Sequence, residues 1–374
     1  MKKVLFMAKA LGGGGAEVAM LELINKMPES EYEITLALLD NDLEYYDRLK
    51  RQVKIIQIEF SNNIARQLVS MYALPAKLLK KLGVNSIIPY YNFLFDSVKN
   101  TFHEEYDLAL DFYGYGYFLT GYMAERINAK KKATWLHDED LKWWFRNVKR
   151  YGRKYDRIFA VSESVKNSFI KNFPELKNKI QVFYNTIDID LIVEKSDYPC
   201  DEHLDGEFII LTVGRLHKQK GYDIAIKTAK ILKDKRIPFK WYAIGLGKEK
   251  EKLERLIKKS NVQDQFILLG RKENPYVYMK QCDIYVQPSR HEGYVITLVE
   301  ARALCLTIVT SDIPSAREQI ADGRNGYIVS LNEQSFAEKI AELYYNKDQR
   351  ECVSDYLRKN KLDFSKELEK LSLE

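Results

Sequence analysis

The chain has 374 residues, a length that predicts two or three domains at roughly 150 residues per domain. Hydrophobic residues make up 46% and charged residues 30%, which is typical of a soluble globular protein and excludes wholesale disorder. Lys plus Arg number 59 against 53 Asp plus Glu, a net charge of +6. This mild excess permits anionic ligands or an anionic membrane surface but argues against a dedicated nucleic-acid binder.

The cysteine pattern and the N-terminus point to a protein of the reducing cytoplasm. The four cysteines form no C-x-x-C pair, so neither a zinc ribbon nor a disulfide framework is indicated. The first residues resemble a signal peptide, but Lys9 and four glycines interrupt the apolar run, so we interpret them as a buried strand. No stretch approaches the roughly 20 apolar residues of a membrane span. We therefore expect a cytoplasmic protein, peripheral at most on the inner face of the cell membrane.

Short apolar runs alternate with helix-length segments in the first half of the chain. This pattern is typical of a parallel sheet that is covered on both faces. We expect helices at residues 16–26 and 163–172. The predicted strands are residues 3–8, 34–39, 53–58, 108–111, 133–136, 157–161 and 179–183.

The alternation fails near residues 190–207, where turn-forming and acidic residues predict a linker. A second α/β series follows, so we expect two doubly wound domains with a ligand crevice at the carboxyl ends of their strands. Its predicted strands are residues 208–213, 240–244, 265–269, 284–287 and 307–310, and its helices 223–233, 248–258, 297–304 and 335–345. The expected boundaries are 1–190 for the first domain, 191–206 for the linker, 207–350 for the second domain and 351–374 for a C-terminal helical segment that packs back on the first domain.

A run of four glycines ending at Gly15 follows the first predicted strand and opens a helix. Glycines let the backbone approach a ligand closely, and the N–H groups at a helix start attract phosphate. The run lacks the G-x-G-x-x-G register of a dinucleotide fold and the G-K-[ST] end of a P-loop. A flexible strand-to-helix turn is the alternative interpretation.

Two basic residues stand in the loop GRLHKQKG, residues 214–221, which also joins a predicted strand to a helix. Arg215 and Lys220 suit a diphosphate, because a guanidinium binds two oxygens and an ammonium adds a point charge. A solvated basic turn is the alternative. It fits Lys218 better than it fits the spaced pair.

Two glutamates bracket seven residues in the segment SRHEGYVITLVEA, residues 289–301. Glu292 falls in a loop after a strand, and Glu300 lies two turns into a helix on an otherwise apolar face. A carboxylate buried there costs several kcal/mol unless it is paired or hydrogen-bonded. Glu300 is therefore expected to accept ligand hydroxyls or a structural donor, with a salt-bridged core glutamate as the alternative.

Together these motifs resemble the retaining nucleotide-sugar glycosyltransferases of family 4, which have the GT-B fold: two Rossmann-like α/β domains that face across a central cleft. The resemblance rests on the two motifs that contain Arg215 and Lys220, and Glu292 and Glu300, and it covers nearly the whole chain. It implies that the first domain binds the acceptor and the second the nucleotide sugar. It also implies that Arg215 and Lys220 hold the donor diphosphate, that Glu300 holds the ribose, and that Glu292 and His137 touch the donor sugar.

The resemblance extends to further donor contacts. Val295 stands where family members often have glycine beside the donor sugar, which leaves the sugar preference open. Arg271 stands where the family packs the nucleobase, with an exposed arginine as the alternative. The implied catalytic residues are His137, Arg215, Lys220 and Glu292, and the implied donor-binding residues are Gly13, Gly14, Gly15, Arg215, Lys220, Gly245, Arg271, Glu292, Gly293, Tyr294, Val295, Ile296 and Glu300.

His137 follows a predicted strand at its carboxyl end, where it would face the crevice; a structural histidine is the alternative. Two D-x-D triplets, at residues 138–140 and 188–190, are interpreted as a helix start and as the beginning of the linker. With Arg215 and Lys220 available to neutralise phosphate, we expect no required metal, and no cofactor besides the nucleotide-sugar substrate.

The segment KWWFRNVKRYGRKY, residues 142–155, combines six basic residues and five aromatic residues without an acid. An anionic membrane surface or single-stranded nucleic acid suits this composition, and an ordinary helix with a buried aromatic face is the alternative. Residues 76–95 are a second such candidate.

The motifs together predict transfer of a sugar, with retention, from a nucleotide diphosphate, UDP foremost, to a glycan or lipid-linked acceptor. No nucleic-acid partner is expected. One alternative is a non-catalytic GT-B partner subunit, which should have lost donor contacts. The other is a nucleotide-dependent oxidoreductase, which should show G-x-G-x-x-G where only residues 245–247 approach it.

Overall fold

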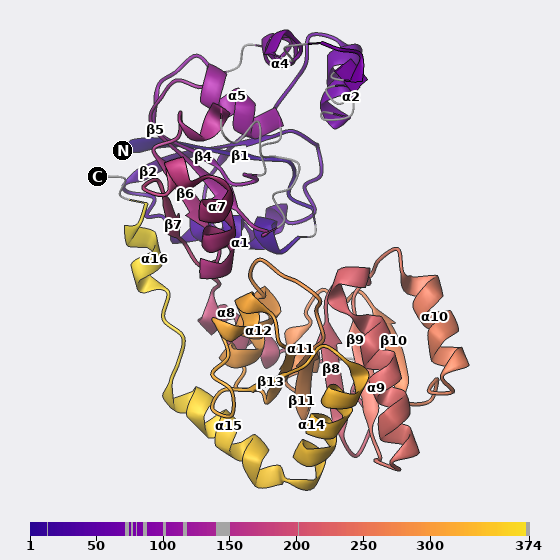
Figure 1. The fold of residues 1–374 in the computed structure, drawn as a ribbon. Helices are drawn as coiled ribbons and strands as arrows, with labels where there is room; N and C mark the ends of the chain where they lie inside the picture. The colour runs from indigo at the N-terminus through magenta and orange to yellow at the C-terminus, as the bar shows by residue number, and fades with distance from the viewer. Residues whose placement is uncertain are drawn as a thin grey trace. The chain divides into compact units, whose positions relative to one another are not determined.

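The computed structural model describes residues 1–371 except 13, 72–74, 76–77, 80, 85–87, 100–101, 115–117, 140–149 and 201. The described residues divide into two compact units, each a parallel α/β structure (Figure 1). The first contains Met1–Ile187 and Phe364–Glu374, and the second contains Asp188–Asp363. The α/β fold class expected from the alternating pattern is confirmed.

The first unit is built on a parallel sheet. Its described residues form seven strands in the order β3-β2-β1-β4-β5-β6-β7. The central strands read as nearly continuous apolar runs because helices cover both faces, and residues 4–7 of β1 are fully buried. The strands are β1 (Lys2–Ala8), β2 (Tyr32–Leu38), β3 (Lys54–Gln57), β4 (Tyr106–Asp111), β5 (Ala129–Leu136), β6 (Arg157–Ala160) and β7 (Ile180–Val182).

An aromatic cluster fills the core between this sheet and its helices. The Phe95 ring lies 5.6 Å from Phe118, 6.2 Å from Tyr122 and 6.3 Å from Tyr151, in the tilted and edge-on arrangements that aromatic pairs prefer. The helices of this unit are α1 (Gly15–Lys26), α2 (Asn63–Ser70), α4 (Ile88–Asp96), α5 (Phe118–Arg126), α7 (Glu163–Asn172) and α16 (Ser365–Glu369), with 3-10 turns at Tyr46–Arg48 and Pro174–Leu176.

The second unit repeats the design with a parallel sheet whose described strands have the order β10-β9-β8-β11-β12-β13. Helices α9 and α14 pack against each other beside it (Figure 1). The strands are β8 (Ile209–Val213), β9 (Lys240–Ile244), β10 (Phe266–Gly270), β11 (Ile284–Gln287), β12 (Ile308–Ser311) and β13 (Tyr327–Val329). The helices are α8 (Ile189–Ser196), α9 (Tyr222–Asp234), α10 (Lys250–Lys259), α11 (Tyr276–Met279), α12 (Ile296–Ala303), α13 (Pro314–Arg317), α14 (Glu333–Tyr345) and α15 (Lys347–Lys359), with a 3-10 turn at Lys218–Lys220.

The expected linker differs most from the structure. Residues 188–196, divided in the prediction between the first domain and the linker, belong to the second unit and contain α8. The Asp188 side chain caps this helix by accepting a hydrogen bond of 3.0 Å from the N–H of Leu191. Helix α8 packs on α11 and α12, and Ile192 is buried. This helix has eight residues, little more than two turns, and the turn-forming and acidic residues beside it hide its periodic signal.

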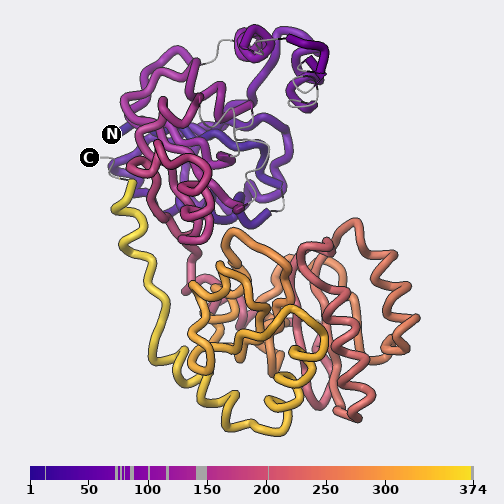
Figure 2. Tube along the Cα trace, viewed as in Figure 1, coloured from indigo at the N-terminus to yellow at the C-terminus, as the bar shows by residue number. Residues whose placement is uncertain are grey.

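The end of the chain returns to the first unit, as Figure 2 shows in yellow from α15 to α16. Glu367 on α16 is 8% exposed. One of its carboxylate oxygens accepts the backbone N–H of Tyr184 at 2.9 Å, and both accept Lys370 Nζ at 2.7 Å. Lys370 also donates to the Val182 carbonyl at 3.0 Å, at the end of β7. These charge-assisted hydrogen bonds hold α16 beside β7.

Candidate active site

Gly221 brings two loops of the second unit together. It follows the 3-10 turn Lys218–Lys220 and takes a left-handed conformation with φ +69° as the N-cap of α9. A Cβ atom at this position would lie 1.9 Å from the carbonyl oxygen of Pro288. Only glycine tolerates both the positive φ and this close approach. The loop after β8 therefore lies directly against the loop after β11.

Arg290 ties the same two loops. Its guanidinium binds both oxygens of Asp223, in the first turn of α9, at 2.8 and 2.7 Å, and it donates to the Lys218 carbonyl at 2.7 Å. The backbone N–H of Arg290 donates to the Gln219 carbonyl at 2.7 Å. A planar guanidinium that pairs with a carboxylate through two bonds fixes orientation as well as distance. The mutual position of residues 218–223 and 288–292 is thus set by four hydrogen bonds.

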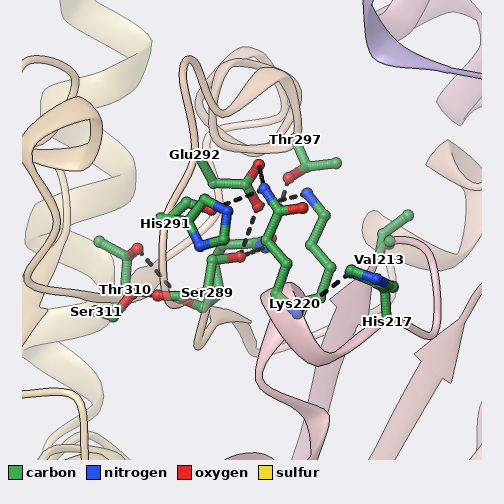
Figure 3. Close-up of polar contacts among 12 residues, drawn as sticks. Val213, His217, Lys220, Ser289, His291, Glu292, Thr297, Thr310 and Ser311 are labelled. Atoms are coloured by element: carbon green, nitrogen blue, oxygen red, sulfur yellow. Dashed lines mark hydrogen bonds and ion pairs between the residues drawn. The ribbon is translucent and has the colours of Figure 1, made fainter. Parts of the chain in front are cut away.

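Lys220 and Glu292 form an ion pair where these loops meet, with Nζ 2.6 Å from Oε1 (Figure 3). Their side chains are only 15% and 9% exposed. Glu292 Oε1 also accepts from Ser289 Oγ at 2.8 Å, and Oε2 accepts from Gln219 Nε2 at 3.3 Å. A carboxylate removed from water needs such partners, because an unpaired buried charge costs several kcal/mol. The pair predicted to serve separate parts of a donor is in direct contact here.

Helix α12 begins four residues after Glu292 and carries Glu300. The Glu300 carboxylate is 9% exposed and accepts a hydrogen bond of 3.0 Å from the hydroxyl of Tyr276 on α11. Val295, which stands where members of the resembled family often have glycine, has φ −93° and is 1% exposed. Its backbone needs no glycine, and its side chain packs inward beside the buried Gly293. Tyr294 and Ile296 are partly exposed.

Hydrogen bonds also join the end of β8 to the end of β9, and the end of β9 to the end of β10, at the same edge of the sheet. The Gly214 N–H donates to the Ile244 carbonyl at 2.9 Å, and the Gly245 N–H donates to the Gly270 carbonyl at 2.7 Å. A Cβ atom on Gly245 would lie 2.0 Å from the Gly214 carbonyl oxygen, so this crossing also requires glycine. Arg215 and Arg271, which follow β8 and β10, are exposed there. The carboxyl ends of the parallel strands therefore gather Arg215, Lys220, Arg271, Glu292 and Glu300 on one edge of the second unit.

His137 and the glycine run belong to the first unit. The His137 ring follows β5, packs on the Phe112 ring with centroids 5.2 Å apart, and binds the Phe112 carbonyl through Nε2 at 2.7 Å. A carbonyl only accepts, so Nε2 carries the hydrogen. Burial lowers the pKa of His137 to about 4, which keeps the imidazole neutral. Gly14 caps α1 and Gly15 opens it, whereas Gly13 lies outside the described residues.

The remaining sequence candidates have structural roles where the structure describes them. Asp188 of the second D-x-D triplet caps α8, and Asp140 of the first lies outside the described residues. No cluster of three His, Cys, Asp or Glu side chains suited to a metal ion occurs in the described part of the chain. Likewise, no helix within the described ranges is long and apolar enough to cross a bilayer.

The basic and aromatic segment 142–155 is described only from residue 150, and segment 76–95 only in part. In the described end of 142–155, Tyr151 and Tyr155 are buried in the aromatic core, and Arg150 and Lys154 pair with Glu125. This end fits the alternative of an ordinary buried aromatic face. The part that would test a membrane or nucleic-acid surface lies outside the described residues.

Sequence reasoning passed over residues that hold the site together. Ser289 and Arg290 stood inside a quoted motif without a role, and Gln287 and Asp223 were not considered. A usable signal existed for Gln287, because a polar residue at the end of the apolar strand IYVQ must find hydrogen-bond partners when buried. Arg290 and Asp223 offered none, since they are 67 positions apart.

Family models identify the class of protein to which this two-unit α/β fold belongs. Residues 13–191 match the model for Glycosyltransferase Family 4, and residues 200–360 match the model for Glycosyl transferases group 1. Between them the two matches take in most of the chain. The chain is therefore a member of the family 4 glycosyltransferases, with the GT-B fold.

Proteins with similar sequences are also named as glycosyltransferases. An uncharacterised glycosyltransferase of Methanocaldococcus jannaschii is 32% identical over 62% of this chain and 62% of its own length. The N-acetylgalactosamine-N,N'-diacetylbacillosaminyl-diphospho-undecaprenol 4-alpha-N-acetylgalactosaminyltransferase of Campylobacter jejuni is 33% identical over 49% of this chain and 48% of its own length. A capsular polysaccharide biosynthesis glycosyltransferase of Staphylococcus aureus is 27% identical over 54% and 56%. The chain thus spans less than two thirds of the length of these relatives.

Solved structures share the fold along the whole chain. HepE of Anabaena, in a complex with UDP and glucose, has a TM-score of 0.72 and 16% identity, covering 100% of this chain and 98% of that chain. TarM of S. aureus, in a complex that includes UDP, has a TM-score of 0.73 and 15% identity, covering 100% and 99%. At these identities the likeness establishes the GT-B fold.

The surroundings of His137 predict how the stability of the protein changes with pH. Because its pKa is lowered from 6.5 to about 4, the unfolded chain binds the proton first, and stability falls as the pH drops from about 6.5 through about 4. An NMR titration should place the midpoint of His137 near pH 4, with its resonance assigned by loss in His137→Asn. That variant keeps a donor for the Phe112 carbonyl and should lose less stability on acidification. A midpoint near 6.5 would contradict the buried neutral imidazole.

Proposed function

We propose that this glycosyltransferase moves a hexosyl residue from a UDP-sugar to a glycan or lipid-linked acceptor in polysaccharide or glycoconjugate synthesis, with retention and without a metal ion. The observation that carries the proposal is the ion pair of Lys220 with Glu292 at the carboxyl edge of the second sheet, in the loop before α12, where Glu300 is the fifth residue of the helix. One cation, one sugar-binding carboxylate and one ribose-binding carboxylate are the groups that a nucleoside diphosphate sugar requires.

Known relatives support the donor and acceptor classes. The Anabaena and S. aureus structures of this fold were solved with UDP, and the Anabaena structure also with glucose. The C. jejuni relative is named for a diphospho-undecaprenol acceptor, and the S. aureus relative for capsular polysaccharide. These names support a cytoplasmic enzyme that meets a lipid-linked acceptor at an anionic membrane surface, a proposal that cosedimentation with anionic liposomes at low and high salt tests.

In the proposed mechanism, Arg215, Lys220 and the first N–H groups of α12 hold the diphosphate. As the bond from the anomeric carbon to the phosphate oxygen breaks, these donors stabilise the negative charge that collects on the leaving phosphate. The acceptor hydroxyl attacks the same face, and a phosphate oxygen takes its proton. The new glycosidic bond replaces the broken one, and UDP leaves with that proton.

The environment of Glu292 favours this front-face route over a double displacement. A double displacement needs a carboxylate that forms a covalent bond to the anomeric carbon. Both oxygens of Glu292 already accept hydrogen bonds, from Lys220 and Ser289 on one and Gln219 on the other. Hydrogen bonds to the ionised form lower the nucleophilicity of a carboxylate and suit it to bind hydroxyl groups instead. The non-catalytic partner subunit is disfavoured because every implied contact residue is present.

The diphosphate contacts can be tested by substitution. Arg215→Ala and Lys220→Ala should each cost roughly 2 to 4 kcal/mol of transition-state stabilisation, measured as kcat/KM for the UDP-sugar. Lys218→Ala removes an exposed charge from the same turn and should leave kcat/KM within about twofold. Activity should persist in EDTA. Wild-type rates in Arg215→Ala, or complete loss with the chelator, would contradict the proposal.

The stereochemical course is tested by proton NMR of the new linkage. An α-linked donor should give an α-linked product, and Glu292→Gln should slow the reaction through lost positioning without changing the anomer. No covalent sugar should accumulate on the wild-type protein. A β-linked product would refute retention, and an adduct trapped on Glu292 would refute the front-face route.

A further inference from the structure

A line of buried polar side chains leads to Glu292, and only its last member, Ser289, entered the mechanism above. The hydroxyl groups of Tyr285 and Thr297 donate to Gln287 Oε1 at 2.7 and 3.0 Å. Gln287 Nε2 donates to Ser289 Oγ at 2.7 Å, and Ser289 Oγ donates to Glu292 Oε1 at 2.8 Å. Tyr285, Gln287 and Ser289 are all 0% exposed. We call this line the Gln287 relay.

The direction of every hydrogen bond in the relay follows from its two ends. Glu292, paired with Lys220, is an ionised carboxylate and can only accept hydrogen bonds. The Ser289 hydroxyl, which has a single hydrogen, must therefore donate it to Glu292. Ser289 can then only accept from Gln287, which must present its NH2 group. The Gln287 oxygen therefore faces Tyr285 and Thr297, both of which can donate. Burial raises the pKa of Tyr285 well above its usual value, so its hydroxyl stays protonated.

The backbone beneath the relay has its own supports. Thr310 Oγ1 donates to the Gln287 carbonyl at 3.2 Å, and Ser311 Oγ donates to the Ser289 carbonyl (Figure 3). Arg290 and Gly221 fix the loop from the other side. Holding the loop in place thus does not depend on the side chains of Gln287 and Ser289. Burying polar side chains costs desolvation free energy that apolar residues of similar size would avoid. Gln287 and Ser289 therefore need a role other than stabilising the fold.

We propose that Gln287 and Ser289 are positioning residues that orient Glu292 for the donor sugar. They commit Oε1 to Ser289 and Lys220, which leaves Oε2, with its longer 3.3 Å bond from Gln219, to accept a sugar hydroxyl. The inference rests on the proposed function, because it takes Glu292 as the sugar contact. On this inference, the relay makes the protein bind a nucleoside diphosphate sugar more tightly than the nucleoside diphosphate alone.

The test compares the affinity for UDP with the affinity for UDP-glucose, UDP-N-acetylglucosamine and UDP-N-acetylgalactosamine by calorimetry, which needs no acceptor. Ser289→Ala should weaken the best UDP-sugar of the panel about tenfold and leave UDP within about twofold. Thr228→Val removes a buried hydroxyl of the same unit that donates to the Glu333 carbonyl, outside the relay and its supports, and should change neither affinity. Wild-type UDP binding shows that each variant keeps its fold.

Gln287→Glu adds a readout that a merely structural residue would not move. The new side chain keeps the acceptor for Tyr285 and Thr297, but it can donate to Ser289 only when it is protonated. Burial and the nearby Glu292 and Glu300 carboxylates raise the pKa of the introduced acid, while Lys220 opposes them. UDP-sugar affinity of this variant should therefore fall between about pH 6 and about pH 8.5, beyond any change in the wild-type protein over that range.

The outcomes separate the two proposals. The relay would be overturned if Ser289→Ala bound UDP-sugars as tightly as the wild-type protein and Gln287→Glu showed no added pH dependence. The proposed function would still stand in that case, because the protein would still bind UDP. Loss of UDP binding in Ser289→Ala and Thr228→Val alike would reduce the relay to a structural feature and overturn it as well. A wild-type protein that binds neither UDP nor any UDP-sugar would overturn the proposed function, and this inference with it.

Discussion

A carboxylate that is taken out of water must be paired, and the edge of the second unit is arranged around that requirement at Glu292. Its partner Lys220 comes from a different loop, 72 positions earlier in the chain. The pair can form only because Gly221 permits the close approach to Pro288 and because Arg290 clamps Asp223. Each of these contacts costs conformational freedom or desolvation, which an apolar loop packing would avoid. Their common result is a cation and an oriented carboxylate, side by side, at the carboxyl ends of parallel strands.

Under the proposed function, this one pair of loops serves both the diphosphate and the sugar of the donor. Lys220 has further N–H donors beyond the one it gives to Glu292, so it can bind phosphate without releasing the carboxylate. Glu292 is held by donors on both oxygens, which makes it a hydroxyl acceptor instead of a nucleophile. The neutral imidazole of His137, in the first unit, is suited to hydrogen bonding and not to electrostatic attraction of phosphate. In the proposed function, Arg215 and Lys220 of the second unit supply the positive charge for the diphosphate.

Much of the fold could be predicted because strands buried on both faces leave continuous apolar runs in the sequence, as at residues 4–7 and 284–286. The strand-end motifs could also be placed, since parallel strands present their carboxyl ends on one edge. Helix α8 was missed because turn-forming and acidic residues lie beside its eight residues and hide the periodic signal, and the three-residue strand β13 was not predicted either. The Gln287 relay was out of reach for a different reason. Its hydrogen bonds depend on which side chains of β11, α12 and the loop between them face inward at the same depth, and spacing along the chain does not report depth.

In the proposed site, Lys220 binds the nucleoside diphosphate. Glu292 holds the Lys220 side chain in place and partly offsets the positive charge of Lys220. Calorimetric titration of UDP into the wild-type protein, Glu292→Gln and Lys220→Met tests this most directly. The account predicts that UDP binds most tightly to Glu292→Gln, because a negative charge beside the diphosphate is removed, and most weakly to Lys220→Met, with the wild-type protein between them. Equal affinities in all three proteins would contradict the claim, because the ion pair would then lie outside the diphosphate site.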